Sequence, residues 1–125
     1  MGIQIKLDVK SGVPFYRQVI DQVKSAIAMG LIEPGDRLPT VRQLAVDLSI
    51  NPNTVSRAYT ELELTGLVET QMGSGTFVGQ RKVEQDDVER RRLLDEICQE
   101  LLARASTHGF TLDDILDNLK QRKSR

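Results

Sequence analysis

Hydrophobic residues recur at helical spacing in three segments of the first half of the chain. The first segment predicts a helix from Pro14 to Met29, and Gly30 is placed to end it. In the second, Thr40 is a suitable N-cap for an amphipathic helix that runs to about Leu48. The third helix is predicted over residues 51–65, after a connection of only a few residues, and this spacing is typical of a helix-turn-helix.

The third predicted helix has two different faces. Asn51 is its expected N-cap, Pro52 its first residue and Gly66 its stop. The apolar stripe consists of Val55, Ala58, Tyr59 and Leu62. The residues off this stripe all have side chains that can form hydrogen bonds: Asn53, Thr54, Ser56, Arg57 and Thr60. A short polar face of this kind fits the DNA major groove, so the segment is predicted to be a recognition helix.

A β-hairpin is predicted directly after these helices. The β-prone pairs Leu67-Val68 and Phe77-Val78 flank Gly73-Ser74-Gly75, so residues 71–76 would form a wing. A glycine-rich turn could instead bind a nucleotide phosphate, but no helix and no Lys-Ser/Thr pair follows it. The pattern therefore favours a winged helix-turn-helix domain over residues 1–79.

Residues 80–125 predict two further amphipathic helices, a long one from about Glu84 to Thr107 and a short one after Thr111. Two such helices cannot bury their apolar stripes completely against each other. They would fold back on the winged helix or, as we favour, pair with a second chain. The candidate dimerisation residues are Leu94, Ile97, Cys98, Leu101, Leu102, Ala105, Ile115, Leu116 and Leu119. The expected fold class is mainly α with a small β-hairpin (α+β), a winged helix-turn-helix followed by a two-helix dimerisation region.

Composition narrows the class of protein. A hydrophobic fraction of 39% and a charged fraction of 28% are typical of a folded globular chain, and the formal net charge is −1. From Arg37 to Thr60 there are three arginines and one acid, whereas Glu61 to Glu69 holds three acids and no cation. This uneven distribution of charge is expected of a protein that turns one face toward DNA phosphates. The sequence contains neither a secretory signal nor an apolar run of about 18 residues, so we expect a cytoplasmic protein without membrane contact.

Metal and enzyme chemistry are not expected. One cysteine and one histidine are too few for a structural zinc site, so neither a metal nor a cofactor is predicted. His108 lies beside the helix stop at Gly109, without a nearby carboxylate triad or nucleophile in sequence, which favours a helix-terminal role over catalysis. Cys98 is expected to pack on the apolar stripe, although a redox role across a dimer is left open.

With these elements placed, the sequence resembles the GntR family of bacterial transcription regulators. The run G-x-x-x-P-G-D-x-L-P-[ST]-x-R-x-L-A occurs in full from Gly30 to Ala45, and INPNTVSRAYTELELTGLVETQMGSGTFV follows it. The resemblance covers roughly residues 14–78. The short helical tail is similar to the YtrA-like subfamily, whose members carry a compact C-terminal dimerisation region.

The resemblance implies DNA contacts at positions that match the family pattern. Arg42 matches an arginine that reaches phosphate or a base, Asn53 and Thr54 match the start of the recognition helix, and Gly73 matches a wing glycine that enters the minor groove. Pro52 and Ser56 replace arginines that read guanine in many relatives, so the operator preference is expected to differ. The candidate DNA-binding residues are Arg37, Thr40, Arg42, Asn51, Asn53, Thr54, Ser56, Arg57, Tyr59, Gly73, Ser74 and Gly75.

The hypothesis from sequence is therefore a homodimeric, sequence-specific repressor of a palindromic operator in double-stranded DNA. A winged helix used only as a protein–protein adaptor is the alternative, and salt-insensitive behaviour or no binding to DNA would favour it. The operator sequence, the target genes and the existence of a small-molecule effector are left open.

Overall fold

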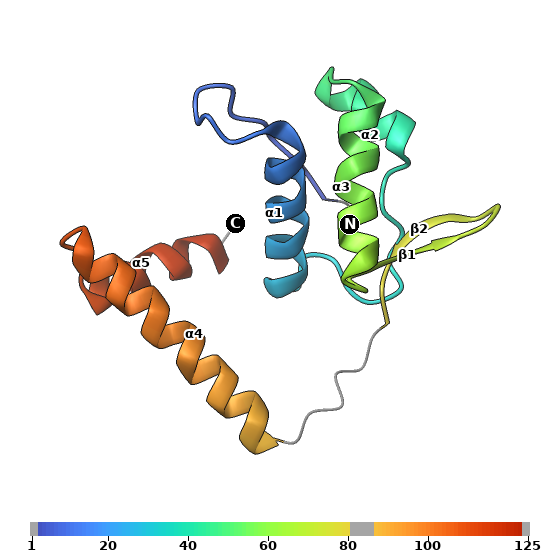
Figure 1. Ribbon diagram of the computed structural model, residues 1–125. Helices are drawn as coiled ribbons and strands as arrows, with labels where there is room; N and C mark the ends of the chain where they lie inside the picture. Colours follow the sequence, from blue (N-terminus) through green and yellow to red (C-terminus); the bar gives the residue numbers. More distant parts are fainter. Residues whose placement is uncertain (1–2, 81–86, 124–125) are drawn as a thin grey trace. The chain divides into compact units, whose positions relative to one another are not determined.

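The computed structural model describes residues 3–80 and 87–123 and divides into two compact units, Met1–Lys82 and Val83–Arg125. The first unit contains three helices and a hairpin in the order α1-α2-α3-β1-β2, and the second contains α4 and α5 (Figure 1). The winged helix-turn-helix fold predicted from sequence is confirmed. Each unit is described by itself below.

Three helices form the body of the first unit, close to where the hydrophobic spacing places them. They are α1 (Phe15–Ala28), α2 (Val41–Leu48) and α3 (Pro52–Leu64), and α3 packs against the other two. Pro14 was expected inside the first helix, but its ψ of 146° is extended and it precedes α1 as the N-cap residue. Gly30 and Gly66 have φ values of 73° and 79°, which confirms them as the helix stops.

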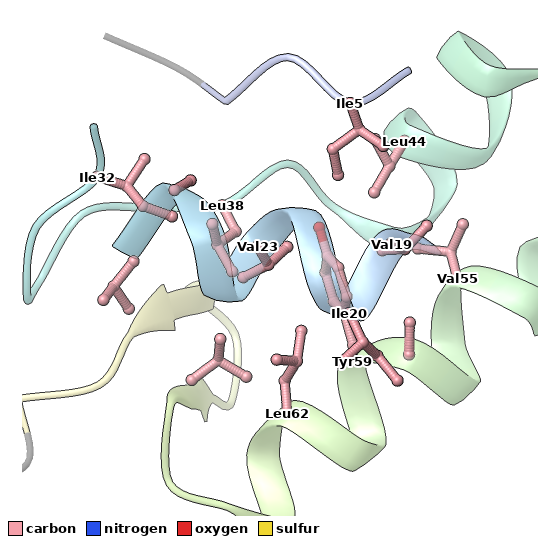
Figure 2. Packing of buried hydrophobic residues seen from close by; sticks show 14 of the residues in the cluster. Ile5, Val19, Ile20, Val23, Ile32, Leu38, Leu44, Val55, Tyr59 and Leu62 are labelled. Carbon is pink, nitrogen blue, oxygen red and sulfur yellow. The ribbon is translucent and has the colours of Figure 1, made fainter. Parts of the chain in front are cut away.

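The hydrophobic core of this unit is mostly aliphatic and is shared by all three helices. Val19, Ile20 and Val23 of α1 face Val55 and Leu62 of α3 in this core (Figure 2). All five of these side chains are no more than 1% exposed, so any truncation there would leave a cavity. The further buried members are Ile5, Ala26, Ile32, Leu38, Leu44, Ala45, Ala58, Tyr59, Val68 and Val78.

The hairpin consists of β1 (Val68–Gln71) and β2 (Gly75–Val78), which pair antiparallel with Val68 opposite Val78. The segment before α2 also joins this small sheet. Arg37 forms an isolated bridge with Phe77, and the Leu38 amide donates to Thr76 O at 2.8 Å. The chain before α2 is thereby attached to the wing strand β2.

The alternation of Ile3, Ile5 and Leu7 with polar residues predicts a short extended segment, and residues 3–8 belong to neither a helix nor a paired strand. Its backbone groups bond instead to glutamine side chains of α1. Gln22 accepts from the Lys6 amide at 2.9 Å and donates to Lys6 O at 2.7 Å. Gln18 makes the same pair of bonds with Asp8, at 2.8 Å and 2.9 Å. These amide side chains replace a partner strand.

The second unit consists of α4 (Asp87–Thr107) and α5 (Leu112–Lys123). The predicted capping box of α5 is confirmed, because the Thr111 amide donates to Asp114 Oδ2 at 2.8 Å and the Asp114 amide donates to Thr111 Oγ1 at 3.3 Å. No described residue of α4 or α5 is buried within the chain. No described helix is long and apolar enough to span a membrane.

Candidate nucleic-acid interface

The N-terminus of α2 presents polar groups to solvent. Thr40 caps this helix, accepting a hydrogen bond from the Gln43 amide at its Oγ1 over 3.0 Å. Arg42 and Gln43 follow in the first turn, and both side chains are exposed. Free backbone amides and a cation at a helix N-terminus attract an anion such as a DNA phosphate. The predicted phosphate-binding residues Thr40 and Arg42 are therefore accessible.

Tyr59 was predicted both to lie on the apolar stripe of its helix and to contact DNA, and the structure places its side chain in the core. Its side chain is only 6% exposed and belongs to the hydrophobic core. Its hydroxyl donates to Pro39 O at 2.7 Å, and burial raises the pKa of this phenol well above its ordinary value. The helical stripe places Tyr59 inside because Val55, Ala58 and Leu62 share its face. Tyr59 instead fixes α3 to the residue that precedes the Thr40 cap.

The exposed face of α3 carries the predicted base-reading side chains. Asn51 caps the helix by accepting from the Asn53 amide at 2.8 Å. Asn53, Ser56 and Arg57 are exposed along the following turns, whereas Thr54 is only partly exposed. Amide, hydroxyl and guanidinium groups on one short helix face can donate to and accept from base edges in the major groove.

Arg57 is the only cation of α3, and it does not extend freely into solvent. Its guanidinium carbon lies 3.7 Å from the centroid of the Tyr16 ring, so the pair forms a cation–π contact between α3 and α1. Its Nε lies 4.0 Å from Glu61 Oε1, with 61% and 40% of the two side chains exposed. At this exposure the ion pair contributes little stability. The Tyr16 contact was not predicted from sequence, because residues 16 and 57 are far apart in the chain.

The tip of the wing consists of Met72, Gly73 and Ser74, which connect β1 to β2. Gly73 has a φ of 80°, and Met72 is 98% exposed. Gly75 belongs to β2 rather than to the tip, where it pairs with Gln71. The wing glycines therefore have different surroundings: Gly73 and Ser74 are accessible for a groove, whereas Gly75 is partly covered.

Arg37 lies beside this strand. A Cβ added to Gly75 would lie 3.1 Å from Arg37 Nε, so the glycine provides the space that the guanidinium occupies. Arg37 is itself exposed and joins the wing through its bridge to Phe77. A cation is thus placed beside the β2 strand of the wing, and an exposed arginine can contact a phosphate.

The second unit exposes its candidate dimerisation residues in the single chain. Leu94, Ile97 and Leu101 of α4 are 60%, 53% and 45% exposed. Leu102, Leu116 and Leu119 are also exposed, whereas Ala105 and Ile115 are partly covered. Cys98 was expected to pack on the apolar stripe, but the chain itself leaves it exposed. The helices are too few to cover both of their apolar stripes.

A hollow of about 370 Å³ lies between α4 and α5, and its lining includes the polar residues Arg104, His108 and Asp114 and the apolar residues Phe110 and Ile115. Within residues 3–80 and 87–123, no group of three or more histidine, cysteine, aspartate or glutamate residues is arranged to hold a metal ion.

Comparison with known proteins adds independent findings. A family model described as "Bacterial regulatory proteins, gntR family" matches residues 15–78. The HTH-type transcriptional repressor YtrA of Bacillus subtilis is 36% identical over 94% of this chain and 90% of that protein. YtrA from Sulfolobus acidocaldarius, a GntR-family transcription factor, is 32% identical with a TM-score of 0.58 and covers 96% of this chain and 97% of that one.

A solved protein–DNA complex is also similar to the first unit. The DNA-binding domain of AraR in complex with operator ORX1 is 27% identical with a TM-score of 0.54. The alignment covers 63% of this chain and 99% of that domain. The similar part of that protein thus has the fold described here and binds an operator.

Proposed function

This chain belongs to the gntR family of bacterial regulatory proteins, and from this premise we propose that it is a homodimeric repressor that occludes a palindromic operator. It is a sequence-specific DNA-binding transcription regulator. Its site of action would be the cytoplasm, where bacterial DNA is accessible. A repressor of this kind needs no catalytic reaction, since bound protein blocks access to the promoter.

The observation that carries the proposal is the exposed polar face of α3, held between an α2 N-terminus and a wing. Asn53, Ser56 and Arg57 would read base edges in the major groove, with Asn suited to adenine and Arg to guanine. Arg37, Arg42 and Thr40 would bind phosphates, and Gly73 with Ser74 would enter the minor groove.

The dimer is supported by the apolar side chains that α4 and α5 leave in solvent, among them Leu94, Ile97 and Leu101. Large apolar side chains that a chain leaves exposed often mark a protein–protein interface. A twofold dimer would present two copies of α3 to half-sites about one DNA turn apart, roughly 34 Å, and therefore prefers a palindrome. A small-molecule effector would act by changing the spacing of these two copies.

Selection from a random DNA library, followed by sequencing of the bound fragments, tests the proposal directly. We expect enrichment of an inverted repeat, with affinity that falls steeply as salt increases. Failure to bind DNA, or an affinity for DNA that does not depend on salt concentration, would favour the alternative that the protein is a protein–protein adaptor. Enrichment of a single half-site would contradict the palindromic dimer.

Arg57→Ala tests the base-reading role. We expect a loss of about 1–3 kcal/mol on the enriched sequence, with thermal stability nearly unchanged because the side chain is 61% exposed. An equal loss on a scrambled duplex would show that Arg57 contacts only the phosphate backbone.

A further inference from the structure

The contact between Tyr16 and Arg57 joins the first turn of α1 to the middle of α3. The Arg57 guanidinium carbon lies 3.7 Å from the centroid of the Tyr16 ring, well inside the distance of about 6 Å at which such pairs attract. We propose that Tyr16 is a positioning residue for base recognition: its ring orients Arg57 so that the guanidinium edge faces DNA. This inference rests on the proposed DNA-binding function of α3.

Stacking and base recognition use different parts of the guanidinium group. The ring of Tyr16 contacts its planar face, whereas a guanine is recognised by the N–H groups along its edge. The ion pair with Glu61 involves Nε, at 4.0 Å, and not the two terminal amino groups. Arg57 can therefore keep its contact with Tyr16 while its terminal nitrogens donate to a base.

The Tyr16 ring lowers the entropic cost of base recognition by Arg57. An exposed arginine side chain loses rotamer freedom when it is fixed. In the free protein Arg57 is already held by Tyr16 and Glu61, so part of this cost is met before DNA binds. Tyr16 is itself held in place because α1 packs against α3 through the buried core.

Local charge also favours an anionic partner at this place. The guanidinium of Arg17 lies 5.7 Å from the same Tyr16 ring, so two arginines approach one aromatic side chain. Glu61 is the acid paired with one of them. An excess of positive charge beside the exposed face of α3 attracts the phosphates that flank a recognised base.

The test uses the full-length chain and two DNA probes: the duplex enriched by the wild-type protein from a random library, and a scrambled duplex of equal composition. Tyr16→Leu removes the ring, Tyr16→Phe keeps it, and Arg17→Ala removes a neighbouring cation as the charge control. Tyr16→Met is a second ring-free variant in case Tyr16→Leu does not fold. Each variant is also combined with Arg57→Ala. Every single and double variant is then used to select DNA fragments from the random library again.

We expect Tyr16→Leu to raise Kd for the enriched duplex about threefold to tenfold and to relax base preference at the position lost in Arg57→Ala. Tyr16→Phe should retain the wild-type affinity and base preference. In the Arg57→Ala background, Tyr16→Leu should cause no further loss of affinity. Arg17→Ala should weaken both probes alike and leave base preference unchanged.

Other outcomes overturn the proposal in distinguishable ways. Tighter binding by Tyr16→Leu would mean that the ring withholds Arg57 from DNA. Additive losses in the double variant would assign Tyr16 a role independent of Arg57. If the wild-type protein enriches no sequence, the proposed function fails, and the positioning role fails with it.

Discussion

Tyr59 and Arg57 are two residues apart on α3, yet the fold gives them opposite roles. Tyr59 is buried and bonds to Pro39 O, whereas Arg57 is exposed and stacks on Tyr16. One side chain therefore holds the α2 cap in position relative to α3, and the other is available to DNA. Helical spacing separates their faces, but only the packed neighbours show what each face contacts.

Tyr59→Phe should destabilise the protein by about 1 kcal/mol, because the bond to Pro39 O is lost. The variant also tests the raised pKa of Tyr59. A phenol that ionises less readily in the folded state stabilises it fully below the ordinary pKa of about 10, and this contribution is lost as pH rises further.

Urea unfolding at pH 8, 10 and 11 provides the measurement. Wild-type stability should fall more steeply above pH 10 than that of Tyr59→Phe, by at most about 1.4 kcal/mol per pH unit. Equal slopes for the two proteins would contradict a buried, protonated Tyr59.

Gly79→Ala should destabilise the first unit by about 1–3 kcal/mol, as overpacking of a tight contact does. A Cβ at this position would overlap with the carbonyl oxygen of Gly66, which is backbone and cannot rotate away. The Gly79 amide also donates to Leu67 O at 2.8 Å, so the strand end cannot shift without losing a hydrogen bond. Thermal unfolding measures the effect.

Gly73→Ala is the matched control. A Cβ at Gly73 would meet no atom within 4 Å, so the substitution costs only the backbone strain of a non-glycine residue at a φ of 80°. We expect a loss of about 1 kcal/mol there. A cost at Gly73 that exceeds the cost at Gly79 would contradict the steric explanation.

Among the elements, the turn of the helix-turn-helix carries backbone strain. Ser49 ends α2 with φ 56° and ψ 46°, and it is the one non-glycine residue with positive φ in the described part of the chain. The Ile50 amide donates to Ala45 O at 3.0 Å across this turn. The left-handed residue thus reverses the chain between α2 and α3, at the cost of steric strain that glycine would not have.

Ser49→Gly should therefore stabilise the protein by about 0.5–1 kcal/mol, after allowing for the larger backbone entropy of glycine in the unfolded chain. Denaturant unfolding measures it, with Ser56→Gly in the middle of α3 as the control that should destabilise. Destabilisation by both substitutions would show that the Ser49 side chain contributes more than its backbone strain costs.

At the scale of the whole molecule, the two units differ in how completely each buries its own apolar residues. The first has a closed core of α1, α2, α3 and the hairpin. The second buries no described residue, so this unit would have low stability unless another surface covers it. This contrast is the physical reason for proposing a dimer through α4 and α5.

Leu101→Asp should convert the proposed dimer to monomers, because a carboxylate in an apolar interface must be desolvated without a partner. Sedimentation velocity would report the change, and affinity for the palindrome should fall toward that of one half-site. Val9→Asp is the control: Val9 is 77% exposed in the first unit, and its substitution should leave the oligomeric state unchanged. A monomeric wild-type protein at micromolar concentration would contradict the dimer.

The sequence by itself determined the helices, their caps and the hairpin. These features depend on local chemistry: Thr40, Asn51 and Thr111 cap the helices that follow them, because each bonds to amides two or three residues ahead. Periodicity likewise identified most of the core, since a helix must bury one continuous stripe.

Only the tertiary structure decided which side chains meet across elements. The Tyr16–Arg57 stack, the Tyr59 bond to Pro39, the glutamine pairs along the N-terminal segment and the space at Gly75 for Arg37 join residues from different elements. Such contacts depend on the angle and register at which elements pack, and the hydrophobic pattern of one segment does not specify these. The tertiary structure therefore decided the partners of both residues: Arg57 stacks on Tyr16, and Tyr59 bonds to Pro39.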